Sequence, residues 1–432
     1  MRGPPTRRVQ PDWLMLGAAL ALSAAGVLVN ASAGGEAALG IPRWALQLVW
    51  TVLGAGVAAA AVFFDHRKLA GAAPFLYAAV LVLLTVVLVL PGAGGEARRW
   101  LTLGPVNLQP AEPAKLAFVL AGAAYLARRD ERPGAGRVLA LTFLALVPTA
   151  LVAVQPDLGT AFVFVPLTLA LLYWGGVPCW KLLLLLAPLA AALAAFTDTP
   201  DWIARAVDSS LLNSPLGAVF RPWWWLGMGA LVAGWLIGRR RKEPFFGFLL
   251  LAAGAASVVL PLGWNLLKAY QQRRVLMFLD PTADPKGAGY NLIQSRIAVG
   301  SGGVWGKGFS QGTQGQLAFL PERHTDFAFS VWAEEWGLIG SLVVILLFAL
   351  LLGRMLRAAG RAADRFGSLV VYGAALMLAF HAAFNIGMCL GLFPVAGLPL
   401  PFVSYGGSFA LVSWLAVGLA AGVERRARLS IF

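Results

Sequence analysis

Residues 320–353 read LPERHTDFAFSVWAEEWGLIGSLVVILLFALLLG. The stretch begins with four ionisable side chains within five positions, Glu322, Arg323, His324 and Asp326. A long apolar run follows directly, and it is long enough for a membrane-spanning helix. Charge costs several kcal/mol in hydrocarbon, so a cluster at this boundary indicates a functional site. We therefore expect chemistry at a membrane surface, with Asp326 as the first candidate.

The composition of the whole chain supports a membrane location. Of the 432 residues, 59% are hydrophobic and 12% are charged, and the mean hydropathy is +0.75. Soluble domains carry about 25% charged residues, so the chain is predicted to be an integral membrane protein. The net charge of +14 is better explained by basic cytoplasmic loops than by nucleic acid, and no nucleic-acid partner is expected. Cys179 and Cys389 have no metal-ligand spacing.

Apolar runs predict an all-α polytopic membrane protein with about twelve transmembrane helices. The predicted spans are 13–32, 43–64, 72–91, 110–127, 137–154, 158–176, 179–197, 222–238, 245–266, 327–353, 367–390 and 407–423. The first run exceeds the 7–15 residues of a usual signal core, so we interpret it as a retained helix. With both termini cytoplasmic, 21 of the 34 basic residues fall in cytoplasmic turns, as the positive-inside pattern requires.

Three predicted outer segments are long enough to be functional, namely 91–109, the region 268–326 and 391–408. We expect one membrane domain, 1–432, in which 268–326 forms a large extracytoplasmic catalytic loop. No internal repeat and no separate soluble domain is evident.

Arg98 and Arg99 are basic residues on the predicted outer side, against the general charge bias. Guanidinium groups match phosphate oxygens, so an anionic lipid headgroup would explain the pair. The alternative is a solvated basic loop.

Glu112 and Lys115 lie three residues apart at a predicted helix start, which places them on one face. They form either an ion pair that holds the helix entry or a pair that lines a polar cavity. Asp157 stands in a short outer turn, where it either caps the next helix or serves the site.

The glycine-rich stretch 300–308 invites comparison with a nucleotide-binding P-loop, but it fails the pattern. Ser301 occupies the place of the first glycine, and Gly308 replaces the Ser or Thr after Lys307. No nucleotide is therefore expected. The glycines either bring main-chain N–H groups close to phosphate or serve tight turns.

Asp326 has two readings of its own. It can cap the following helix, but capping explains neither Arg323 nor His324. A single carboxylate beside cations suits a general base or a metal ligand better than a nucleophile.

The chain resembles the SEDS family (shape, elongation, division, sporulation), membrane glycosyltransferases that polymerise lipid II into peptidoglycan. The motifs that carry the resemblance are 97–101, 109–115, 155–160, 284–290, 296–303, 320–327 and 398–408. Arg323 within the 321–326 motif is similar to the elongation-type, RodA-like branch, because the division-type, FtsW-like branch usually has Ala there. The family typically has ten helices, so residues 198–266 are predicted to hold a two-helix insertion. Pro113 also departs from the family, which usually has a bulky apolar residue at this position.

The resemblance implies a peptidoglycan glycosyltransferase for cell elongation and shape in the bacterial inner membrane, with an extracytoplasmic site. Asp326 would be its general base. Candidate residues for binding the substrate and its pyrophosphate are Arg98, Arg99, Glu112, Lys115, Asp157, Arg296, Lys307, Arg323, His324 and Ser404. A divalent cation, Mg²⁺ or Mn²⁺, is expected; its ligands are unknown, with Asp326 and Glu112 as candidates. The expected partners are lipid II, nascent glycan on undecaprenyl pyrophosphate, membrane lipid and a class B penicillin-binding protein. The alternative function is a flippase for lipid-linked precursors.

Overall fold

The computed structural model describes residues 11–36, 40–89, 99–103, 106–128, 133–179, 181–182, 289–313 and 320–429. The chain divides into two compact units, one of 1–131, 140–175 and 274–432 and one of 132–139 and 176–273. Of the second unit, the structure describes the first residues of one helix and a few residues near 180. The predictions for Arg98, for the insertion 198–266 and for the spans 222–238 and 245–266 lie outside the described residues, as does nearly all of 179–197.

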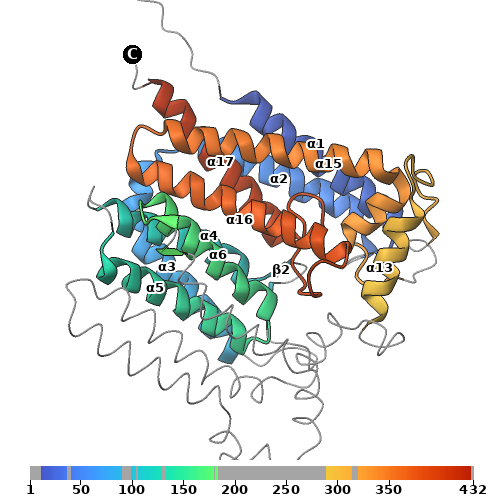
Figure 1. The fold of residues 1–432 in the computed structure, drawn as a ribbon, viewed down its shortest axis with the longest axis horizontal. Helices are drawn as coiled ribbons and strands as arrows, with labels where there is room; N and C mark the ends of the chain where they lie inside the picture. The colour runs from blue at the N-terminus through green and yellow to red at the C-terminus, as the bar shows by residue number, and fades with distance from the viewer. Residues whose placement is uncertain are drawn as a thin grey trace, which may run out of the picture. The chain divides into compact units, whose positions relative to one another are not determined.

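The described part of the chain is mostly helical, as Figure 1 shows. Its long helices are α1 (Trp13–Ala33), α2 (Arg43–Phe63), α3 (His66–Val89), α4 (Ala111–Ala127), α5 (Ala135–Val154), α6 (Leu158–Trp174), α13 (Tyr290–Ser301), α15 (Ala328–Arg361), α16 (Arg365–Cys389) and α17 (Gly407–Leu429). Among the described residues, seven helices are long and apolar enough to cross a membrane. The prediction of a helical, multi-pass membrane protein is confirmed.

The structure differs from the predicted spans in three places. Helix α15 continues to Arg361, eight residues past the predicted end at 353, because its last turns still bury Met355, Ala358 and Ala359 within the fold. Helix α13 lies within the predicted loop 268–326, and its 12 residues are too few to register as a membrane span. A small antiparallel hairpin, β1 (Leu101–Leu103) and β2 (Val106–Leu108), adds strand to a fold predicted as all-α.

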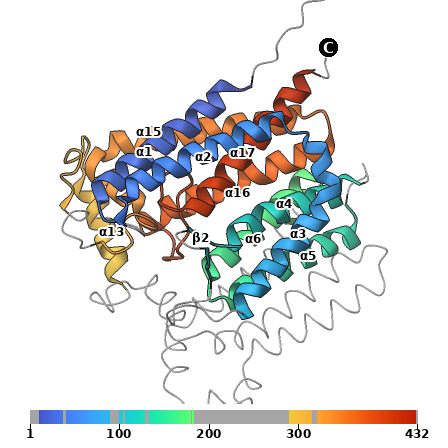
Figure 2. The same cartoon turned by 180° about the vertical axis from the view of Figure 1, so that it is seen from behind.

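Helices α16 and α17 form the centre of the first unit, since 67% and 83% of their apolar windows are buried. In α2 and α3 only 28% and 22% are buried, and the exposed side chains on these helices include large apolar ones such as Val52 and Phe75. Such faces suit contact with lipid. Figures 1 and 2 show α1, α2, α15, α16 and α17 side by side, and α17 packs on α2 while α15 packs on α1 and α16.

Small residues bring α2 and α17 into close contact. A Cβ atom added at Gly418 would lie 2.6 Å from the Cα atom of Ala58, and one at Gly54 would lie 2.3 Å from the ring of Trp414. Lipid tails are as apolar as side chains, so helices in a membrane associate largely through such close packing. The glycines of α2 and α17 therefore help to set the centre of the bundle.

One end of the bundle carries basic residues and ion pairs, and we call it the basic end. Asp12 caps α1 by accepting from the N–H groups of Leu14 and Met15, and the Arg354 guanidinium donates to it from α15. Arg428 pairs with the buried Glu424 on α17. The contact between Arg354 and Asp12 joins the ends of α15 and α1 on the side opposite to the predicted site.

Asp364 at the basic end provides a prediction about pH. Its carboxylate accepts a hydrogen bond from Gly367 N–H at 2.7 Å and lies 2.7 Å from His66 Nε2. The contact with His66 is the main reason that the pKa of Asp364 is lowered to about 2. Because its pKa is lower in the folded state, the ionised carboxylate stabilises the fold above about pH 4, and this stabilisation is lost as pH falls towards 2. At pH 7 we expect the free energy of unfolding of the wild-type protein to be roughly 2 kcal/mol higher than that of Asp364→Asn. Denaturant titrations in detergent should show that gap closing only below about pH 4; a gap that closes between pH 7 and 5 would contradict the prediction.

Candidate functional site

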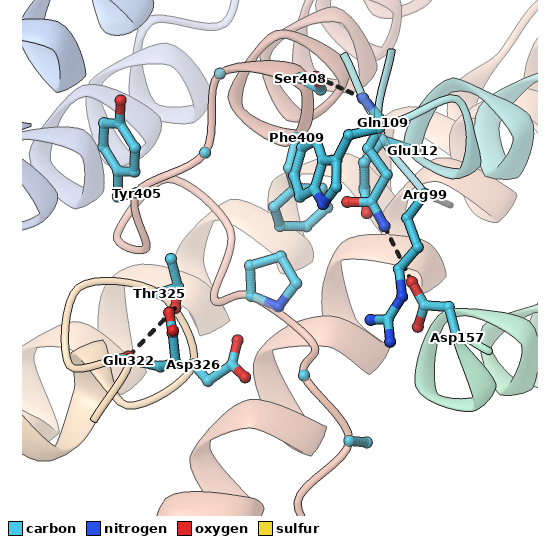
Figure 3. Close-up of a pocket in the computed structure, with 16 residues that line it drawn as sticks. Arg99, Gln109, Glu112, Asp157, Glu322, Thr325, Asp326, Tyr405, Ser408 and Phe409 are labelled. Carbon is cyan, nitrogen blue, oxygen red and sulfur yellow. Dashed lines mark hydrogen bonds between the residues drawn. The ribbon is translucent and has the colours of Figure 1, made fainter. Parts of the chain in front are cut away.

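A pocket of about 330 Å³ lies at the end of the bundle opposite the basic end (Figure 3). It is formed where α4, α6 and α17 begin and where the turn before α15 meets the loop between α16 and α17. Its lining residues are Arg99, Trp100, Gln109, Glu112, Asp157, Glu322, Thr325, Asp326, Ala396, Gly397, Pro399, Tyr405, Gly406, Gly407, Ser408 and Phe409. The pocket thus joins five of the sequence motifs.

Asp326 lines this pocket and does not cap α15. The N-cap of α15 is Phe327, which makes no side-chain cap hydrogen bond. The preceding turn is tight: Glu322 has a positive φ of 50°, and Thr325 donates to its carboxylate at 3.0 Å. Gly397, with a φ of +69°, faces Asp326, and a Cβ atom there would lie 3.5 Å from Asp326 Oδ2. Of the two readings of Asp326, the geometry favours the pocket carboxylate.

Two hydrogen bonds from the loop after α16 hold the main chain of this turn. The N–H of Tyr405 donates to the carbonyl of His324 at 2.8 Å, and Ser404 Oγ donates to the carbonyl of Thr325 at 2.5 Å. Ser404 Oγ also accepts from the N–H of Leu400 at 2.9 Å. Ser404, predicted to bind substrate, is thus buried behind the pocket wall and acts on the main chain.

The next carbonyl, that of Asp326 itself, is held by Asn385 of α16. The buried Asn385 amide donates to Asp326 O at 2.8 Å and to Leu398 O at 2.7 Å. Three consecutive carbonyls of the turn are therefore hydrogen-bonded to α16 and the loop that follows it. This arrangement fixes the main chain of the turn that carries Asp326.

We expect Asn385→Leu to impair both stability and activity. Leucine has a similar size, but it removes the amide hydrogen bonds to the carbonyls of Asp326 and Leu398, and an unmet buried acceptor costs about 1–3 kcal/mol. Thermal unfolding in detergent and the turnover rate measure the two effects. Asn30→Leu is the control, because this buried Asn bonds only within its own helix, to Gly26 O. Equal losses in the two variants would mean that Asn385 does not position Asp326.

Glu112 and Lys115 form an ion pair of 2.7 Å, and both are almost completely buried. Glu112 lines the pocket, whereas Lys115 lies behind it, 2.9 Å from His381 Nε2 and 5.0 Å from the ring centre of Phe409. The pair thus has a feature of each interpretation from sequence: its members bind each other at the start of α4, and Glu112 also faces the cavity.

Asp157 likewise combines both of its readings. One carboxylate oxygen caps α6 by accepting from Thr160 N–H at 3.2 Å, and the other accepts from Gln109 Nε2 at 3.0 Å. Arg99 enters the pocket beside it, just before β1 (Figure 3). The Nε atom of Arg99 is buried and has no hydrogen-bond partner among the described residues. Arg99 lines the pocket and brings positive charge to it.

Four other predicted residues do not line the pocket. Lys307 pairs with the buried Glu334 at 2.6 Å, and Arg296 is exposed on α13. Arg323 and His324 lie on the same turn as Asp326, and the carbonyl of His324 helps to hold that turn by accepting from Tyr405 N–H. Burial, with the charge of Arg43 nearby, lowers the pKa of His324 below 6.5, which favours its neutral form at pH 7.

The glycine-rich stretch packs against α15 instead of lining the pocket. Added Cβ atoms at Gly302 and Gly306 would lie 2.1 Å from carbonyl oxygens of α15, near its kink at Gly337. The N–H groups of Lys307 and Gly308 donate to the same helix at 3.0 Å. Close packing and turns explain these glycines, in agreement with the second of the two readings.

His381 and Asn385 were missed in the sequence, although both support the pocket. They lie four residues apart on α16, so they share one face of an otherwise apolar helix. Polar residues within a membrane helix are expensive and often functional, and that signal could have identified them.

A metal centre built by protein side chains alone is not found in the described part of the chain. No group of three or more His, Cys, Asp and Glu side chains there is suited to hold an ion. The carboxylates that line the pocket do not make a complete ligand set. The described residues therefore do not form a complete protein site for the predicted divalent cation.

The fold and the pocket define a polytopic helical membrane protein with a carboxylate site at one end of its bundle. The model of the FtsW/RodA/SpoVE cell cycle protein family matches residues 12–214 and 226–429. The chain belongs to this family.

Named relatives agree with the RodA-like branch. The chain is 32% identical to peptidoglycan glycosyltransferase RodA of Treponema pallidum over 96% of this chain and 98% of the relative. It is 37% identical to peptidoglycan glycosyltransferase MrdB of Escherichia coli, over 84% and 80%. A chain of a solved peptidoglycan synthase complex, described as coordinating polymerization and crosslinking, is similar with a TM-score of 0.64 and 30% identity over 96% and 98% of the two chains.

Proposed function

We propose that this chain is a peptidoglycan glycosyltransferase that polymerises lipid II during cell elongation and shape maintenance. The observation that carries the proposal is the Asp326 carboxylate, which lines a pocket while the carbonyls around it are hydrogen-bonded in place. The names of the RodA and MrdB relatives and the family membership support the same activity.

The proposed reaction uses Asp326 as general base. The 4-hydroxyl of an incoming GlcNAc loses its proton to Asp326, and its oxygen forms a bond to the anomeric carbon of the growing chain. The bond from that carbon to undecaprenyl pyrophosphate breaks, and the pyrophosphate leaves with the electron pair. Negative charge develops on the leaving group, and the Arg99 guanidinium stabilises it. A positioned general base typically raises the reaction rate by a factor of about 10²–10⁴.

The proposed orientation places the pocket on the extracytoplasmic side, with about twelve helices and both termini in the cytoplasm. The charge distribution supports it, since α15, α16 and α17 carry Arg354, Arg361, Arg365, Arg425, Arg426 and Arg428 at the basic end. An extracytoplasmic pocket would meet the headgroup of a lipid-linked precursor after its translocation.

The proposed partner is a class B penicillin-binding protein, which would supply the crosslinking activity. The likeness to a chain of a peptidoglycan synthase complex supports an assembly of this kind. A divalent cation also stays part of the proposal, because Mg²⁺ is often held by one or two carboxylates together with substrate phosphates. The proposed steps do not depend on that cation.

The test uses the purified full-length chain with lipid II in detergent or liposomes. Glycan strands longer than the starting disaccharide, resolved on a gel, would support the polymerase. Transfer of the headgroup across sealed vesicles without any strand formation would instead identify a flippase and overturn the proposal.

A further inference from the structure

A buried histidine connects the Glu112–Lys115 pair to the pocket loop. His381 has no exposed surface, and its Nε2 atom lies 2.9 Å from Lys115 Nζ. Its Nδ1 atom lies 3.3 Å from the carbonyl oxygen of Pro399. A lysine ammonium only donates and a carbonyl only accepts, so His381 must accept at Nε2 and donate at Nδ1. Its two neighbours therefore define one neutral tautomer.

The Lys115 ammonium depends on this arrangement. It is completely buried, and a buried charge is tolerated only when it is paired and hydrogen-bonded. Glu112 at 2.7 Å supplies the opposite charge, His381 supplies a neutral acceptor, and the Phe409 ring face lies 5.0 Å away. His381 thus directs the ammonium without competing for its charge.

The lining of the pocket shows where this chain of contacts acts. Glu112, Pro399 and Phe409 line the pocket, whereas Lys115 and His381 do not. Each of the three lining residues contacts Lys115 or His381 from behind the wall. A change at His381 therefore reaches the pocket through two separate parts of its wall, the start of α4 and the loop before α17.

We propose that His381 is a positioning residue for the glycosyl transfer, holding Lys115 against Glu112 and anchoring Pro399, so that the Glu112 carboxylate keeps its place in the pocket wall. The inference rests on the proposed function. His381 does not line the pocket, so its effect passes through Lys115 and through the carbonyl of Pro399.

The variants separate this role from simple packing. His381→Gln keeps one acceptor and one donor on a flexible side chain, whereas His381→Phe keeps the ring shape and loses both. We expect His381→Phe to lower the rate at saturating lipid II at least about tenfold, because small misplacements in a site cost up to about 10². His381→Gln should retain activity within about threefold. Tyr77→Phe is the control, since it removes a buried hydrogen bond, to Leu144 O, away from the pocket.

A double-mutant cycle tests whether His381 acts through Lys115. If it does, the loss in His381→Phe combined with Lys115→Met should be smaller than the product of the two single losses, because only the contact to Pro399 is left for His381→Phe to remove. Multiplicative losses, or a wild-type rate in His381→Phe, would overturn the proposal. Should His381→Phe fail to fold, His381→Leu takes its place, and a folded but inactive His381→Gln protein would refute the inference on its own. Failure of the wild-type protein to polymerise lipid II would contradict the proposed function instead.

Discussion

Asp326→Asn is expected to reduce lipid II polymerisation by about 10²–10⁴, the range that a positioned general base contributes. Asparagine has the same shape, and the main-chain hydrogen bonds from Asn385, Ser404 and Tyr405 do not depend on the carboxylate. The variant should therefore fold with the pocket intact while lacking a group that can accept the proton of the sugar hydroxyl.

Gel analysis measures this effect as the amount of glycan strands that the purified protein makes from lipid II with no other enzyme present. Asp65→Asn provides a matched control, because it makes the same chemical change at the basic end, where Asp65 contacts Arg426. A folded Asp326→Asn protein that polymerises at the wild-type rate would refute the assignment of Asp326 as base.

Lys115→Met is expected to destabilise the protein by about 3–5 kcal/mol, the cost of leaving one partner of a buried ion pair alone. Glu112 is 2% exposed, so its carboxylate would lose its counter-ion without gaining water. The remaining folded protein should also be less active, because Glu112 lines the pocket.

Unfolding by denaturant in detergent measures the loss, and Glu112→Gln in the same chain is the control. Adding Glu112→Gln to Lys115→Met removes the stranded charge, so the double variant should recover part of the stability. A double variant that is less stable than Lys115→Met alone would show that the pair is not coupled in this way.

The membrane helices were predictable, because burial in lipid imposes a simple requirement. An apolar run of about 20 residues must satisfy its own main-chain hydrogen bonds, and a helix does so locally. The runs that became α1, α2, α16 and α17 needed no knowledge of their neighbours. Short elements such as α13 and the β1–β2 hairpin were missed, because neither has the length or apolar run of a membrane span; α13 packs on α15 and α16, and β2 contacts α17.

The candidate site was only partly predictable. Charge at the start of an apolar run drew attention to Asp326, and the pair at the start of α4 was recognised from its spacing. Lys307 has the same kind of side chain as Lys115, yet it pairs with Glu334 outside the pocket lining. The spacing of Lys115 after Glu112 predicted its partner, whereas the partner of Lys307 lies on another element and is settled only when the helices pack.

Hydrophobicity and charge along the chain were enough to establish a multi-pass membrane protein with an acidic residue at a membrane boundary, since both properties act locally. The support of that residue came from contacts between segments far apart in the chain; Ser404 and Thr325, for example, are 79 positions apart. Asn385 and His381 acquired their roles in the same manner, through carbonyls and an ammonium supplied by other parts of the chain. Hydrogen bonds have short range and definite direction, so their partners are settled only when the helices have packed.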